Sequence, residues 1–117
     1  MALGFLATKA RSDVLNLPVP AELVPGLVDA LDHLRASAGA DRGADLDALA
    51  HQLADGGPLT ARRDLLGELL AVAIDEAGER IGSQSTGLLR GEGSVGELRA
   101  LLAELGGLLE LFERLDA

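Results

Sequence analysis

Two pairs of potential metal ligands recur at the same spacing in this chain. Asp29 precedes His33 by four residues, and Asp47 precedes His51 by four. That spacing places both members of a pair on one side of a helix. Carboxylate and imidazole groups bind zinc and other divalent ions, so these four residues are the candidate metal ligands. Each pair falls opposite the leucines of its own segment, however, which favours ordinary surface pairs.

Two pairs of carboxylates also lie one helical turn apart, Asp64 with Glu68 and Asp75 with Glu79. Such a pair can bind a cation or, when it is removed from water, can supply an acid and a base. Nearby arginines would neutralise part of the charge. The pattern therefore favours a solvated helix edge over a catalytic site.

Residues 82–94 are rich in glycine and serine and invite comparison with phosphate-binding loops. Gly82 and Gly87 have the glycine spacing of such a loop, but Leu88 and Leu89 stand where lysine and serine or threonine are required. No serine there lies in the Gly-x-Ser-x-Gly register of a hydrolase nucleophile. We expect a flexible linker, and we identify no resemblance to a known family.

The elements that position these residues are predicted to be helices. Apolar side chains recur at helical spacing, and proline and glycine interrupt the pattern at Pro18, Pro20 and residues 56–58. The fold class is therefore predicted as all-α, a single domain over residues 1–117 built as a bundle of about five helices. Their predicted spans are 2–15, 21–38, 45–54, 60–81 and 95–116, with Asp45 as the N-cap of the third.

The long fourth segment is predicted to be a central helix. Over residues 65–74 its only charged side chain is Glu68, and its large apolar groups cover more than half of the helix circumference. One neighbouring helix cannot bury so wide a surface. Thr60 is the expected N-cap and Gly82 the expected end, although the helix could also continue toward Arg90.

The last helix, residues 95–116, has the clearest apolar period. Ser94 and Glu97 have the spacing of a capping box at its start. An overlapping set, Val95, Leu102 and Leu109, widens its leucine-rich stripe. The predicted interaction face consists of the stripe Leu98, Leu101, Leu105, Leu108, Phe112 and Leu115 and an opposite strip of small residues, Gly96, Ala100, Ala103 and Gly107.

Glycines inside the predicted helices lower the stability of those helices, so other interactions must offset this loss. Each destabilises an exposed helix interior by up to about 1 kcal/mol relative to alanine. Close helix packing, within one chain or between chains, can offset that cost. Together with the two-sided last helix, these positions predict at least a dimer: Gly26, Gly67, Gly78, Gly96, Gly106 and Gly107.

Composition narrows the classes of partner. The formal net charge is −9, spread over all of the predicted helices, which disfavours nucleic acid and anionic membrane surfaces. There are no cysteines, so disulfides and thiolate sites are excluded. No segment has the pattern of a signal peptide or a membrane span. We expect a cytoplasmic protein, and the arginine-rich, lysine-poor composition indicates a bacterial source.

Three classes of function are consistent with these patterns. The preferred one is a non-enzymatic module for protein–protein interaction, which self-associates or docks through leucine-rich helix faces and needs no cofactor. The first alternative is an acidic inhibitor, antitoxin or immunity-type protein that covers a basic partner. The second alternative is a helical protein that binds a metal or another ligand.

Overall fold

The computed structural model describes residues 14–37, 39 and 42–115. These residues are mostly helical, as predicted, and they form four α-helices and a small two-stranded sheet that was not predicted. In chain order the elements are β1 (Val14–Leu17), the single 3-10 turn η1 (Ala21–Leu23), α2 (Val24–Ser37), α3 (Gly43–Ala54), β2 (Leu59–Arg62), α4 (Arg63–Leu89) and α5 (Val95–Arg114).

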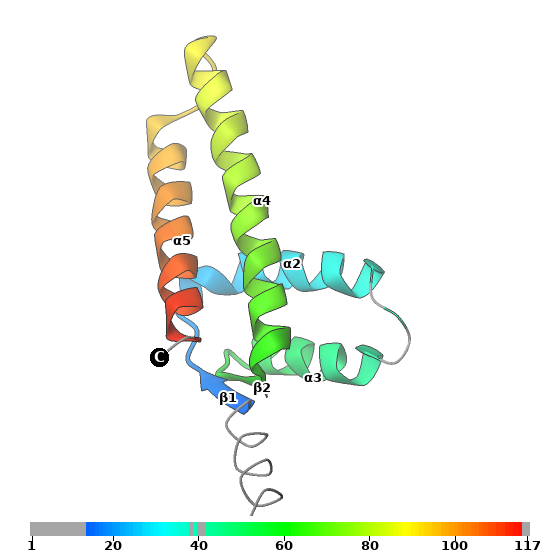
Figure 1. Cartoon of the computed structure of the whole chain (residues 1–117). Helices are drawn as coiled ribbons and strands as arrows, with labels where there is room; N and C mark the ends of the chain where they lie inside the picture. Colours follow the sequence, from blue (N-terminus) through cyan, green and yellow to red (C-terminus); the bar gives the residue numbers. More distant parts are fainter. Residues whose placement is uncertain (1–13, 38, 40–41, 116–117) are drawn as a thin grey trace, which may run out of the picture.

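The predicted first helix lies largely outside the described residues. Residues 14 and 15, at its predicted end, belong to strand β1, which pairs antiparallel with β2 at one end of the molecule (Figure 1). Leu17 pairs with Leu59 in that ladder, and both side chains are buried. The sheet therefore anchors two distant segments of the chain to the same core.

Thr60 lies in β2 and does not cap the central helix, so the predicted N-cap was wrong. The side chain of Gln52, in α3, bonds the free edge of β2 instead. The Thr60 amide donates to Gln52 Oε1 at 2.8 Å, and Gln52 Nε2 donates to the Thr60 carbonyl at 3.3 Å. Because Gln52 bonds both backbone groups of Thr60, this residue stays in an extended strand and α4 begins only at Arg63.

Helices α2 and α3 form a short hairpin that lies across α4 (Figure 1). Pro25 is in the first turn of α2, where its missing amide hydrogen costs no helical bond. Helix α3 begins two residues earlier than predicted, and Arg42, not Asp45, occupies its N-cap position. The buried residues of the pair repeat at helical spacing: Leu27, Leu31 and Leu34 on α2, and Leu46, Leu49 and Leu53 on α3.

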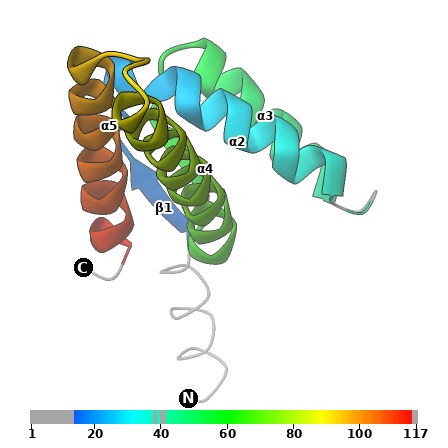
Figure 2. The ribbon, with the colours of Figure 1, turned by 90° about the horizontal axis from the view of Figure 1, so that it is seen from above.

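Helix α4 is the central helix, as its wide apolar surface predicted. It contacts α2 on one side and α5 on another, and the view from above shows it between them (Figure 2). Its buried residues are Leu65, Leu66, Leu69, Leu70, Ala73 and Ala77. The core of the protein is therefore built around the first four turns of this helix.

Helix α4 continues to Leu89, so the predicted end near Gly82 was wrong and the alternative of a longer helix was right. Of the predicted linker, residues 82–94, only residues 90–94 are irregular. Thr86 Oγ1 donates to the Gly82 carbonyl at 3.0 Å within the added turns. Gly91 and Gly93 have φ angles of 79° and 90°, which favour glycine, and they reverse the chain into α5. The predicted capping serine is confirmed, since Ser94 Oγ accepts from the Glu97 amide at 3.4 Å.

The core ends well before the tip of the α4–α5 hairpin. None of the residues from Gly78 to Gly107 is buried, and the structure describes all of them. Figure 1 shows the far end of this hairpin extending beyond the other labelled elements. The two helices therefore project from the body as an arm with large aliphatic side chains but no core of its own.

We predict that Leu66→Ala, in the core, lowers the free energy of unfolding by about 2 to 5 kcal/mol, because it leaves a cavity at a fully buried position. The control Leu89→Ala removes a side chain that is 90% exposed and should change it by less than about 0.5 kcal/mol. Urea denaturation followed by circular dichroism measures both. Equal losses for the two variants would contradict this description of the core.

Candidate functional site

The first pair of candidate metal ligands, Asp29 and His33 on α2, faces α4. His33 Nδ1 lies 2.8 Å from Glu76 Oε2, and Asp29 Oδ2 lies 3.8 Å from the Arg80 guanidinium. Both contacts join α2 to α4. The pair therefore takes part in contacts between helices, each member with a different partner.

The second pair, Asp47 and His51, lies on α3. Asp47 Oδ1 is 2.6 Å from the guanidinium of Arg35, and His51 Nδ1 is 2.8 Å from the Asp47 carbonyl, within its own helix. Within residues 14–37, 39 and 42–115, no three histidine or acidic side chains are grouped as metal ligands would be. The structure does not bring the two pairs together into one site.

The acidic pairs of α4 lie at the surface. Asp64 Oδ1 accepts from the Leu65 amide at 2.9 Å, and Glu68 Oε2 lies 2.8 Å from the guanidinium of Arg42. Asp75 and Glu79 are both exposed. None of these four carboxylates is buried among apolar groups, which is the environment that an acid and base pair would need.

The predicted interaction face is partly buried in the core and partly accessible to solvent. Leu108 and Leu115 are buried in the core of the single chain. Leu98, Leu101 and Leu105 are half-buried. Helix α5 therefore uses part of its leucine surface to pack on α4 and η1, and another part remains accessible.

The accessible part forms a continuous stripe, which we call the α5 stripe. Its six residues follow one another by steps of three and four, which keeps them on one side of the helix. Four of them are among the most exposed large apolar residues of the described chain, namely Val95 (57%), Leu102 (49%), Leu109 (44%) and Phe112 (39%). The complete stripe is Val95, Leu98, Leu102, Leu105, Leu109 and Phe112.

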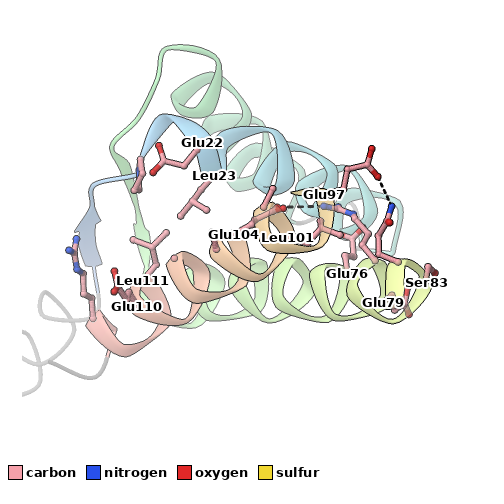
Figure 3. Close-up of a pocket in the computed structure, with 17 residues that line it drawn as sticks. Glu22, Leu23, Glu76, Glu79, Ser83, Glu97, Leu101, Glu104, Glu110 and Leu111 are labelled. Carbon is pink, nitrogen blue, oxygen red and sulfur yellow. Dashed lines mark hydrogen bonds and ion pairs between the residues drawn. The ribbon is translucent and has the colours of Figure 1, made fainter. Parts of the chain in front are cut away.

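On roughly the opposite side of α5 lies a groove of about 1000 Å³ between η1, α4 and α5, which we call the acidic groove (Figure 3). Three members of the predicted small-residue strip, Ala100, Ala103 and Gly107, line it, together with Leu23, Leu101 and Leu111. Gly96, the fourth member, is exposed near the start of α5 and is not part of the lining.

Carboxylates surround this small-residue floor. The lining holds six glutamates and two arginines, an excess of four negative charges. Figure 3 shows the labelled glutamates arriving from η1, α4 and α5. The glutamates are Glu22, Glu76, Glu79, Glu97, Glu104 and Glu110, and the arginines are Arg80 and Arg114.

Arg80, on α4, contacts both α5 and α2 beside the groove. Its guanidinium lies 3.5 Å from Glu104 Oε1 on α5 and 3.8 Å from Asp29 Oδ2 on α2. Gly26 on α2 permits this approach, since a Cβ atom there would overlap the Glu104 carboxylate. At the tip, Gln84 Nε2 donates to Glu97 Oε2 at 2.9 Å and joins α4 to α5 again.

Sequence reasoning found the small-residue floor but missed the acidic residues around it. Glu22, Glu76 and Glu104 are far apart in the chain and follow no common motif. Only the antiparallel packing of α5 on α4, with η1 at one end, brings them to one groove. Helical periodicity alone could have shown that Glu97 and Glu104 share a side of α5 with Ala100, but nothing more.

Comparisons with known proteins identify no relative: no family model matches the sequence, and searches of curated proteins and of solved structures also gave no match. In the part of the chain that the structure describes, every helix is too short or too polar to span a bilayer. The function must therefore be argued from the surfaces themselves.

Two neighbouring glycines of α5 test the geometry of the groove floor. A Cβ at Gly107 would lie 3.1 and 3.2 Å from the methyl groups of buried Leu23, whereas a Cβ at Gly106 would point into open space. We predict that Gly106→Ala raises the free energy of unfolding by up to about 1 kcal/mol, through helix propensity. Gly107→Ala should gain less or lose stability. Urea titration of both variants checks the order, and equal gains would show that Gly107 is not packed as described.

Proposed function

We propose that this protein is a non-enzymatic interaction module that self-associates through the α5 stripe. The observation that supports this most directly is the α5 stripe itself, an accessible row of apolar side chains that begins on the part of the α4–α5 hairpin without a core. An apolar surface of this kind marks an interaction site in a soluble protein, because water-exposed leucines gain free energy when a partner covers them.

The spacing of the α5 stripe suits a second helix. Steps of three and four place its residues at the two inward positions of a heptad repeat, so that side chains of one helix fit between those of the other. Isologous pairing with a second copy is the commonest arrangement of soluble homo-oligomers. In an antiparallel pair, Val95 would lie opposite Phe112 of the second copy, a small side chain against a large one.

The arm itself would become the middle of a larger bundle. Two α4–α5 hairpins that meet through their α5 stripes place four helices around a shared apolar layer. Ile81 and Leu88, seven residues apart on α4, are half-buried in this arm. The second hairpin would supply the missing core beyond Gly78.

The α5 stripe is tested by Leu102→Glu/Leu109→Glu, which adds charges to its centre. We expect the unmodified protein to be a dimer or larger at micromolar concentration and this variant to be a monomer, because the pairing would bury unpaired carboxylates. The control Leu89→Glu/Val28→Glu adds the same charge at exposed positions outside the stripe and should keep the mass of the unmodified protein.

Light scattering after size exclusion gives the masses, and circular dichroism verifies that both variants remain helical. An unmodified protein that stays monomeric at every concentration would contradict the proposal. So would a control that dissociates as completely as the stripe variant.

A further inference from the structure

The acidic groove is a second surface, separate from the α5 stripe. At about 100° per residue, Ala100, Ala103 and Gly107 point away from the side of α5 that carries Leu102 and Leu109. Self-association through the stripe therefore leaves the groove accessible. An inference about what the groove binds goes beyond self-association and rests on different residues.

The shape of the groove suits a helix. Its lining extends along α5 from Glu97 to Arg114. A helical rise of about 1.5 Å per residue makes this a length of about 25 Å. Ala100 and Ala103, three residues apart on the floor, are exposed and small, so another helix can approach them closely. At Gly107 the floor is already covered by the side chain of Leu23. The groove is therefore long enough to take several turns of an amphipathic helix.

The charge of the groove selects a cationic occupant. Glu22, Glu79 and Glu110 line it and are exposed, and no ion pair among the described residues involves any of them. These carboxylates are therefore available to lysine or arginine side chains of a partner. Two rows of acidic groups beside an apolar floor match a helix with basic flanks and a narrow apolar face.

Glu76 adds a polar group at the inner side of the groove. One of its carboxylate oxygens contacts His33, and the other, Oε1, is buried without a hydrogen-bond partner in the described structure. A buried acceptor without a partner is costly. A positive charge placed nearby in the groove would reduce that cost.

The lining disfavours a small apolar ligand. Pockets for such ligands are lined mainly by hydrophobic and aromatic side chains with a few polar groups. Here eight of the lining residues are charged and none is aromatic. We propose that the acidic groove binds a cationic amphipathic helix of a partner protein, with its small apolar side chains on Ala100 and Ala103 and its basic side chains between the glutamates.

The charge requirement is tested with a synthetic helical peptide of alanine, leucine and lysine, in which the lysines flank an alanine-rich face. Its binding to the full-length protein is measured by fluorescence anisotropy. Glu79→Gln/Glu110→Gln should weaken binding about tenfold, because it removes two of the unpaired carboxylates. The control Glu92→Gln/Glu113→Gln makes the same change in net charge outside the groove and should weaken it less than about twofold.

The floor is tested by Ala103→Leu, which fills the groove without a change of charge. We expect it to weaken binding of the same peptide at least about tenfold. Ala36→Leu, at an exposed position of α2, is the control and should bind as the unmodified protein does. Circular dichroism verifies that both are folded.

Four results would overturn the proposal. The first is that the peptide does not bind the unmodified protein, and the second is that Ala103→Leu binds it as tightly as Ala36→Leu does. Equal losses in the two glutamine variants would show a general attraction to an acidic protein. If Ala103→Leu instead reduces the oligomer to a monomer and Leu102→Glu/Leu109→Glu does not, the groove takes a second copy of this chain and no cationic helix. Peptide affinity and molecular mass are separate readouts, so failure of the groove and failure of the α5 stripe are distinguishable.

Discussion

The structure depends on how far along α4 other helices pack against its leucines. The first four turns of α4 contact α2 on one side and α5 on another, and together with α3, η1 and the small sheet they enclose the core. Beyond Gly78, apart from the contact of Arg80 with Asp29 on α2, the helix that packs on α4 in the described part of the chain is α5. Two helices bury the contact between them but leave their other sides in water, so the arm cannot form an interior. Its exposed aliphatic side chains follow directly from the loss of the third layer.

This geometry gives the two sides of α5 opposite chemical properties. The α5 stripe is apolar and extends from the arm, where a second copy would complete the bundle, to Phe112 near the core. The acidic groove has small residues at its floor and carboxylates at its edges, and it suits a partner of opposite charge. The two surfaces point in different directions, so a dimer would present two acidic grooves. An adaptor that pairs with itself and holds a basic helix is the assembly that these surfaces favour.

Much of the helical structure could be predicted from the sequence, because long segments repeat at helical spacing and Ser94 marks the start of α5. The strands could not, since each has four residues and β1 pairs with a segment more than forty residues away. Thr60 has the chemistry of a helix cap, yet strand pairing and Gln52 hold it extended. Periodicity showed that α5 has two apolar sides but not which one faces α4. It therefore placed Leu108 on the contact surface, although this side chain is buried.

Hydrogen exchange of the full-length protein at several concentrations tests the central claim most directly, because it reads the order of the arm segment by segment. The account predicts that backbone amides of residues 95–107 exchange quickly at low protein concentration and become protected as the concentration rises. Amides of residues 65–73, in the core, should be equally protected throughout. Slow, concentration-independent exchange in residues 95–107 would show that the arm is stable without a partner and would contradict the account.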